Sequence, residues 1–164
     1  MFSYRESDPS PSPVLLVDDR WEDNFLLQRL LRVAKIRNPV ITAGSGADAI
    51  ELLEHALRDG RPALPCLVYL DVAMPERSGF DVLQWMREHA ALKDVAVVML
   101  SASENPADIQ RAYEIGAQSY LMKYPSSQTL AEIVELASLP ASLRGGFPRL
   151  SPGDERPGSR RILP

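Results

Sequence analysis

Five polar residues stand at the ends of short apolar stretches and have side chains that could act together. They are two adjacent acids, a third acid, a hydroxyl and an ammonium group: Asp18, Asp19, Asp71, Ser101 and Lys123. Carboxylates that lie close together repel one another, and a divalent cation relieves that repulsion. Carboxylate oxygens suit Mg²⁺, which also binds phosphate oxygens. A lysine ammonium pairs with a phosphoryl oxygen as a compact charge. The set predicts a phosphoryl site beside a magnesium ion.

The elements that must bring these residues together alternate between strands and helices. Short apolar stretches predict buried strands at residues 14–17, 38–43, 66–71, 95–101 and 119–123. Amphipathic spacing predicts helices at residues 21–35, 47–60, 80–90, 105–116 and 126–138. This order predicts an α/β fold with a doubly wound, five-stranded parallel sheet and five helices. Ligands of such sheets bind outside the carboxyl ends of the strands, so we expect the polar residues to share one edge.

The length and composition predict one domain with tails. The chain has 164 residues, of which 45% are apolar and 24% charged, as in ordinary globular proteins. We predict a flexible leader at 1–12, a domain at 13–138 and a Pro/Gly/Arg-rich C-terminal arm or tail at 139–164. The leader lacks the apolar core of a secretory signal, and no apolar stretch is long enough to span a membrane. A lone Cys66 excludes an internal disulfide framework, so we expect a cytoplasmic protein without membrane contact.

The net charge of −4 is divided between two opposite parts of the chain. Residues 140–164 contain five Arg and two acids, a net charge of +3, and the remainder carries −7. An acidic body argues against nonspecific nucleic-acid binding through that body. The tail is therefore the one part for which the charge leaves such binding open.

Four stretches resemble the receiver domains of two-component response regulators: VLLVDD, YLDVAMPERSG, VVMLSAS and SYLMK. The resemblance runs from about Val14 to about Ala137 and implies a flavodoxin-like sheet with strand order 2-1-3-4-5. It implies that Asp71 accepts a phosphoryl group from a sensor histidine kinase. Asp19, Asp71 and the Ala73 carbonyl would hold Mg²⁺, with Asp18 reaching it through water. Lys123 would bind the phosphoryl oxygens, and Ser101 and Tyr120 would form the switch pair, with Tyr120 swinging inward as Ser101 moves.

One position departs from the receiver pattern. The family usually has Pro directly after the Lys, often with a cis bond between them, whereas this chain reads Lys123, Tyr124, Pro125. A cis bond before a residue other than proline costs about 2.5–4 kcal/mol. Two arrangements follow: packing compensates for a cis Lys123–Tyr124 bond, or the loop into the last helix differs from that of the family.

The output is expected to be binding. Only 26 residues follow Ser138, too few for a DNA-binding or catalytic output domain. The resemblance implies a phosphoacceptor signalling protein that promotes its own phosphoryl transfer and dephosphorylation, and not an enzyme with a separate substrate. The stretch from Trp85 to Lys123 is similar to bacterial stand-alone regulators, including those paired with bacteriophytochrome kinases. We expect a homodimer through one apolar face: Ile109, Tyr113, Tyr120, Met122 and Tyr124.

Three alternatives accompany this reading. A phosphorylation-independent adaptor would keep the receiver shape, but it would be expected to lose an acid or the lysine. A flavodoxin-like electron carrier is rejected, because Asp18 and Asp19 would repel a flavin phosphate. The C-terminal segment is either a disordered tail or an arm whose apolar residues dock on a partner protomer, guided by the charge asymmetry. Those apolar residues are Leu139, Leu143, Phe147, Leu150, Ile162 and Leu163.

Overall fold

A computed structural model describes residues 10–59 and 64–151 of the chain. The strands are β1 (Val14–Val17), β2 (Val40–Ala43), β3 (Leu67–Asp71), β4 (Ala96–Ser101) and β5 (Ser119–Met122). The long helices are α1 (Trp21–Val33), α2 (Gly46–Asp59), α3 (Gly79–Glu88), α4 (Pro106–Ile115) and α5 (Ser127–Ser138). Two short 3₁₀ helices occupy Ala90–Leu92 and Ala141–Leu143. Most of the predicted leader, residues 1–9, lies outside the described residues.

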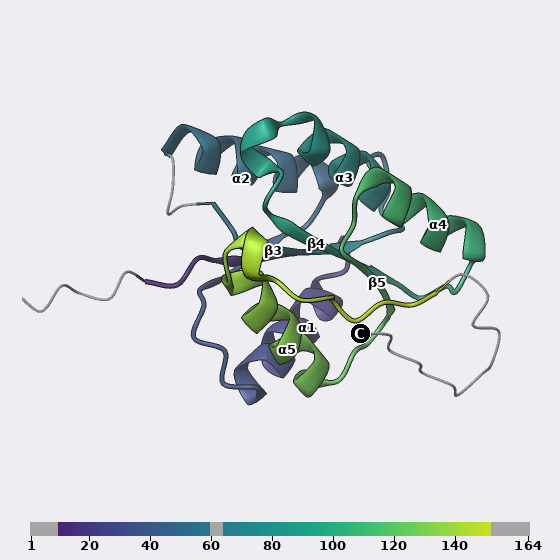
Figure 1. Cartoon of the computed structure of the whole chain (residues 1–164). Coiled ribbons are helices and arrows are strands. Elements are labelled where there is room, and N and C mark those ends of the chain that lie inside the picture. Colours follow the sequence, from purple (N-terminus) through teal and green to yellow (C-terminus); the bar gives the residue numbers. More distant parts are fainter. Residues whose placement is uncertain (1–9, 60–63, 152–164) are drawn as a thin grey trace, which may run out of the picture.

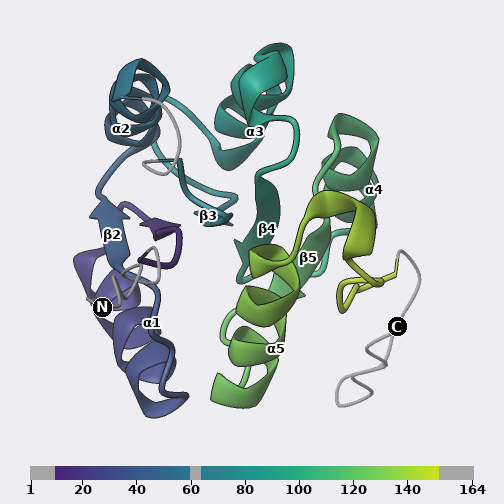
Figure 2. The ribbon, with the colours of Figure 1, turned by 60° about the vertical axis from the view of Figure 1, so that its left-hand side comes forward.

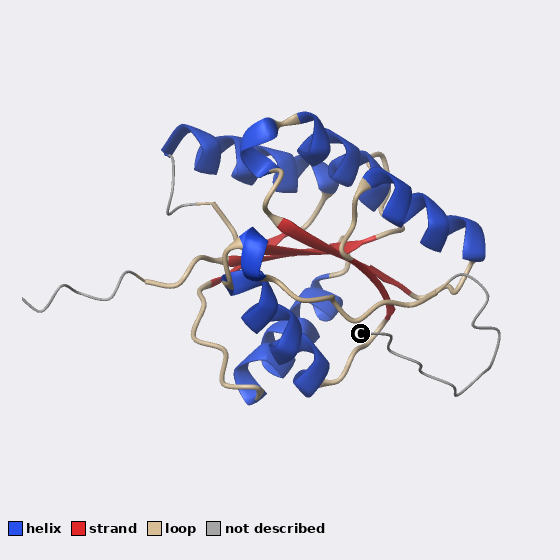
Figure 3. Ribbon diagram, in the orientation of Figure 1, coloured by secondary structure: helices blue, strands red, loops and turns tan. Residues whose placement is uncertain are grey.

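The five strands form one parallel sheet in the order β2-β1-β3-β4-β5. Helices α2, α3 and α4 cover one face, and α1 and α5 cover the other (Figures 1 and 3). This arrangement confirms the predicted doubly wound fold and its strand order. Each face has its own apolar core, one beneath each helix layer. In the part of the chain that the structure describes, no helix is long and apolar enough to cross a membrane.

The helix boundaries follow local capping. Ser78 accepts a hydrogen bond from the Asp81 backbone in a capping box before α3. Asn105 caps the start of α4, and Gly116, with a φ of 115°, caps its C-terminal end after Ile115. The first helix was expected to reach Lys35 but ends at Val33, because Lys35 takes a left-handed φ of 58°. The predicted end of the second helix at Gly60 lies outside the described residues.

The C-terminal segment folds back on its own chain. After α5 the backbone turns and runs beside β5 and α4 (Figures 1 and 2). The Leu150 N–H donates to the Tyr120 carbonyl at 3.2 Å, and the Tyr113 hydroxyl donates to the Leu150 carbonyl at 2.8 Å. Phe147 is 6% exposed and joins the core beneath α1 and α5. We call residues 139–151 the arm.

Two possibilities were expected for this segment, a disordered tail or an arm on a partner protomer, and residues 139–151 instead pack against their own chain. Strand β5 lies at the edge of the sheet, so one side of its backbone is not paired with another strand of the sheet. The arm begins directly after α5 and lies along that side. The Ser119 hydroxyl adds a hydrogen bond to the Pro148 carbonyl. A short tether favours this intramolecular pairing over pairing with a second copy. The remaining expected arm residues, Ile162 and Leu163, lie outside the described residues.

The expected dimer face is also corrected in part. Ile109 is 2% exposed and Tyr120 is 0% exposed, so both belong to the core and cannot form a surface contact. Tyr113 and Met122 are partly buried, and Tyr124 is 37% exposed. The sequence pattern identified these residues by their apolar type, but Ile109 lies on the buried side of α4 and Tyr120 lies in the buried part of β5.

Candidate metal and phosphoryl site

The strand register brings the predicted polar residues to one edge of the sheet. Val17 pairs with Leu70 across β1 and β3, so the residues that follow, Asp18 and Asp71, are neighbours. Asp71 itself ends β3 opposite Leu100. Beyond the end of β5, the Lys123 N–H donates to the Ser101 carbonyl at 2.8 Å. The parallel sheet thus gathers side chains that are up to 105 positions apart in sequence.

Three carboxylates form a compact acidic cluster. One oxygen each from Asp18, Asp19 and Asp71 lies within 4.8 Å of the others. Asp18 and Asp71 are buried and Asp19 is exposed, so the cluster opens to solvent on the Asp19 side. Ala73 follows two positions after Asp71 and is exposed. Hard oxygen donors with an open side are the donor set that Mg²⁺ takes up in proteins. The residues present fit a divalent cation.

Lys123 lies among carboxylates from three elements. Its Nζ is 2.6 Å from Asp18, 2.9 Å from Asp23 and 3.1 Å from Asp71. The Lys123 side chain is 10% exposed. Burial alone would lower the pKa of Lys123, but hydrogen bonds to Asp18 and Asp23 outweigh it and raise the pKa. The ammonium is therefore fully charged at neutral pH.

Burial raises the pKa values of two acids of the site, Asp71 and Asp18. Burial, followed by the charge of Asp18, raises the pKa of Asp71 from 3.8 to about 6, against the lowering effect of Lys123. Burial also raises the pKa of Asp18, although hydrogen bonds from Lys123 and the Arg20 backbone oppose it. The Asp71 carboxylate is consequently a stronger base than an exposed aspartate. A cation bound in the cluster would favour its ionised form.

Asp23 is a site residue that the sequence reasoning missed. It lies in the first turn of α1, and its second oxygen accepts from Lys123 while its first accepts from the Tyr124 hydroxyl. Burial would raise the pKa of Asp23, but these two hydrogen bonds lower it overall. A signal was available, because Asp23, Leu27 and Leu31 are spaced by four on the buried side of α1. An acid on that stripe indicates an ionic partner inside the fold.

The expected switch residues connect to the site through the loop after β4. The Tyr120 ring is fully buried, and its hydroxyl donates to the Ser103 carbonyl at 3.0 Å. The Ser103 N–H donates in turn to the Ser101 hydroxyl at 3.0 Å. Tyr120 therefore already points inward in this structure. The Lys123–Tyr124 peptide bond is cis, which is the first of the two arrangements expected at this departure.

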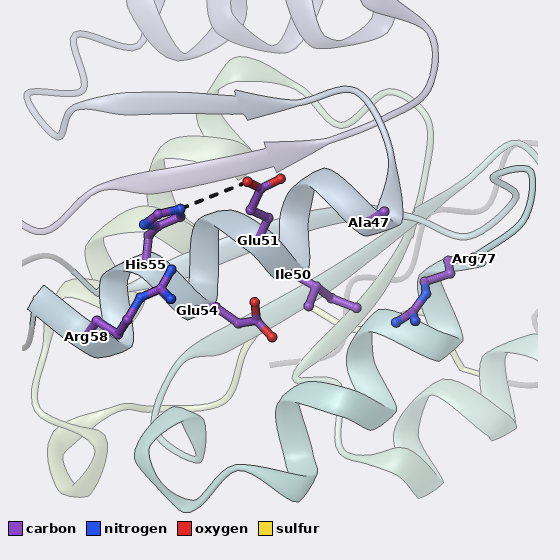
Figure 4. Close-up of a pocket in the computed structure, with 7 residues that line it drawn as sticks. All are labelled: Ala47, Ile50, Glu51, Glu54, His55, Arg58 and Arg77. Carbon is purple, nitrogen blue, oxygen red and sulfur yellow. Dashed lines mark ion pairs between the residues drawn. The ribbon is translucent and has the colours of Figure 1, made fainter.

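A shallow groove lies elsewhere, along α2. It is lined by charged and apolar side chains, and His55 Nε2 is 4.0 Å from Glu51 Oε1 (Figure 4). No residue of the acidic cluster lines it. Both side chains of that ion pair are more than half exposed, so the pairing is weak. The clustered charged side chains lie instead at the carboxyl ends of the strands.

Comparison with known proteins establishes the family. The chain matches the family described as the response regulator receiver domain over residues 14–135, and it belongs to this family. It is 39% identical over 116 residues to two-component response regulator ORR3 of Oryza sativa subsp. indica, covering 70% of this chain and 82% of that protein. It is 31% identical over 130 residues to response regulator Rcp1 of Synechocystis sp., covering 79% and 88%.

Solved structures give the same result. The bacteriophytochrome response regulator AtBRR superposes with a TM-score of 0.66 at 28% identity, covering 77% of this chain and 93% of that one. The Mn²⁺-bound form of Rcp1 gives 0.62 at 30% identity, covering 76% and 90%. The phosphorylated cyanobacterial phytochrome response regulator RcpA gives 0.64 at 29% identity, covering 76% and 89%. The chain is thus a two-component response regulator, as its motifs predicted.

Proposed function

We propose that this receiver accepts a phosphoryl group on Asp71 from a phosphohistidine of a sensor kinase. The observation that carries the proposal is the position of Lys123, whose ammonium lies 3.1 Å from the Asp71 carboxylate beside two further acids. An Asp71 oxygen attacks phosphorus, the new O–P bond forms, and the histidine N–P bond breaks. The bond electrons remain on the histidine nitrogen, which then takes up a proton.

The residues of this chain divide the work of the transfer. Asp18, Asp19 and Asp71, together with the Ala73 carbonyl, would hold a divalent cation, and we propose that this cation is Mg²⁺. When bound, the cation neutralises part of the negative charge of the phosphoryl group. The Mn²⁺-bound form of the relative Rcp1 supports a divalent cation of this kind. Lys123 supplies a positive charge to the phosphoryl oxygens from the other side.

Ser101 and Tyr120 are proposed to carry the signal outward. The Ser101 hydroxyl accepts from the Ser103 N–H, and the Ser103 carbonyl accepts from Tyr120. A phosphoryl group that draws the Ser101 hydroxyl toward itself breaks the first of these hydrogen bonds. The loop after β4 then changes position, and with it the surface of α4. The output is a changed protein–protein interaction.

The partner that we propose is a cytoplasmic sensor histidine kinase, and specifically one of the bacteriophytochrome type. Two bacteriophytochrome response regulators, AtBRR and RtBRR, share the fold of this chain over most of its length. Such a partner fits a protein that signals by binding and does not act as an enzyme on a separate substrate. We propose no contact with DNA or with a membrane. The acidic body argues against the first of these contacts.

We also propose a homodimer that forms on the α4–β5–α5 side of the molecule. Tyr113, Met122 and Tyr124 are partly exposed there. Ile109 and Tyr120 are buried and support this surface from the core. The arm occupies part of this side through Leu150, which bonds to both Tyr113 and Tyr120. Dimerisation on this side therefore requires the arm to move.

The proposal is tested with beryllofluoride and a small phosphodonor, each with and without Mg²⁺. The full chain is expected to bind beryllofluoride and to acquire an alkali-labile acyl phosphate in a Mg²⁺-dependent manner. Asp71→Asn should do neither, and Asp81→Asn, in the exposed cap of α3, should behave as the wild type. A wild-type protein that binds neither probe would instead support a phosphorylation-independent adaptor.

A further inference from the structure

Two neighbouring features of the site have no role in the chemistry described so far: the buried Asp23 and the tyrosine that follows Lys123. Asp23 Oδ2 is 2.9 Å from Lys123 Nζ, and Asp23 Oδ1 accepts from the Tyr124 hydroxyl. Arg20 Nε lies 4.0 Å from the same Oδ2. The Asp23 and Lys123 side chains are each 10% exposed. Each oxygen of the carboxylate thus has its own donor, and the group is fixed in orientation.

Asp23 differs from the other two carboxylates on Lys123 because it stands outside the acidic cluster. Among the described residues, the cluster consists of Asp18, Asp19 and Asp71. A divalent ion held by this cluster would compete with the Lys123 ammonium for the oxygens of Asp18 and Asp71. A carboxylate that shares its charge with a divalent ion holds the ammonium less strongly, since the two cations repel each other. Asp23 lies outside that cluster, and its partners among the described residues are the Lys123 ammonium, the Tyr124 hydroxyl and, at 4.0 Å, the Arg20 guanidinium.

We propose that Asp23 and Tyr124 form a positioning pair that keeps Lys123 in place once a cation and a phosphoryl group occupy the site. The inference rests on the proposed function. An ammonium has three donors, and here they face Asp18, Asp23 and Asp71. Asp23 would keep one donor, and the donors toward Asp18 and Asp71 would turn to phosphoryl oxygens once a cation binds those two acids. Lys123 has a flexible four-carbon stem, and a fixed partner reduces the freedom that the transition state would otherwise have to remove.

The pair also accounts for the departure from the receiver pattern. Tyr124 stands where the family usually has proline, and proline has no hydroxyl to donate. In this chain the tyrosine hydroxyl reaches back to α1 and orients the Asp23 carboxylate. The substitution thereby adds a link between the first helix and the loop after β5, with Lys123 between them.

A purely electrostatic role predicts the opposite sign. Asp23 places one more negative charge beside a site that takes an anionic phosphoryl group. If charge were its only effect, Asp23→Asn would speed phosphoryl transfer to Asp71, because repulsion would fall. Positioning predicts slower transfer, because Lys123 loses its fixed partner. The two readings are separated by the direction of a single rate change.

The experiment uses the full chain, acetyl phosphate as the donor and saturating Mg²⁺. Asp23→Asn should be phosphorylated about tenfold more slowly, and Tyr124→Phe about threefold more slowly, because each loosens the same anchor. The Mg²⁺ dissociation constant, measured separately by calorimetry, should stay within about twofold of the wild type in both variants, since Asp23 is not in the cluster. Tyr124→Phe keeps every charge and so isolates the hydroxyl.

Two results would overturn the inference. One is phosphorylation of Asp23→Asn at the wild-type rate or faster. The other is a loss of Mg²⁺ affinity as large as the loss of rate, which would make Asp23 a metal ligand. If Asp23→Asn fails to fold, the phosphorylation rate of Tyr124→Phe decides: a rate equal to that of the wild type would overturn the inference. Failure of the proposed function is distinguishable, because the wild type would then not be phosphorylated at all.

Discussion

At the residue scale, the position of Asp71 depends on a glycine at the start of α3. The Gly79 N–H donates to the Val72 carbonyl at 2.9 Å, which draws the helix start against the end of β3. A Cβ at Gly79 would lie 2.2 Å from the Asp71 carbonyl oxygen and 3.0 Å from the Met99 methyl carbon. The first distance is far inside van der Waals contact. Only glycine allows the backbone that carries the phosphoacceptor to approach α3 so closely.

Gly79→Ala should therefore disturb both stability and the site. We expect the free energy of unfolding to fall by about 1–3 kcal/mol from overpacking, and Mg²⁺ binding to weaken because β3 must shift at Asp71. Denaturant unfolding and Mg²⁺ calorimetry measure the two effects. Gly44→Ala is the matched control, since the nearest atom to its Cβ, Asp48 Oδ2, is 3.8 Å away. Equal behaviour of the two variants would show that the close approach is unimportant.

At the scale of elements, the arm protects the edge of the sheet. It crosses the edge of β5 from one core to the other, with Phe147 in the core beneath α1 and α5 and Leu150 against the core beneath α4. Exposed strand edges pair readily with other chains, and proteins commonly cover them. Arg149 also lies over the Tyr113 ring at 3.8 Å. The arm thus occupies the side of the molecule where a second copy is expected to bind.

Removal of the arm should release that side. A chain that ends at Ser138 is expected to lose about 1–3 kcal/mol of stability, mainly from Phe147 burial, and to dimerise more tightly than the full chain. Analytical ultracentrifugation gives the dimerisation constant, and denaturant unfolding gives the stability. A chain that ends at Ser151 keeps the whole arm and should match the full protein. A weaker dimer after truncation at Ser138 would mean that the arm binds the partner protomer.

At the scale of the whole molecule, the site opposes folding until a cation occupies it. Asp71 has a pKa of about 6 in the folded chain against 3.8 as the ordinary value. Between pH 3.8 and about pH 6, Asp71 keeps its proton in the folded state and loses it in the unfolded state. The free energy of unfolding therefore decreases as the pH rises through this range. A divalent ion that binds only the folded state adds stability by mass action. The metal-free protein should therefore be more stable near pH 5 than near pH 7.

Asp71→Asn tests this balance. In the presence of EDTA at pH 7.5, the variant is expected to unfold with a free energy about 1–3 kcal/mol higher than the wild type, because the costly ionisation is removed. The decrease in stability from pH 5 to pH 7 should shrink with it. Added Mg²⁺ should stabilise the wild type and leave the variant nearly unchanged. If the variant were less stable than the wild type at pH 7.5, the Lys123 ion pair would outweigh the burial of Asp71.

The sequence by itself determined the fold class and most of the site. Buried parallel strands read as continuous apolar stretches, and four of the five stretches here end in a polar residue or pair. All strands of a parallel sheet run in one direction, so their carboxyl ends lie at the same edge, while the strand order was implied by the resemblance to receiver domains. Asp18, Asp71 and Lys123 could be placed at that edge on this ground, and the strand order then made Asp18 and Asp71 neighbours. Caps such as Ser78 and Asn105 are local interactions of residue types that favour helix starts.

Tertiary structure decided what local pattern does not encode. The spacing of Asp23 with Leu27 and Leu31 indicates a buried acid, but only the packing of α1 against the loop after β5 shows that its partners are Lys123 and Tyr124. The placement of the arm likewise depends on which edge of the sheet lies within reach of the end of α5. Contacts of this kind join residues about 100 positions apart. They are settled by the geometry of the whole sheet and not by the spacing of residue types.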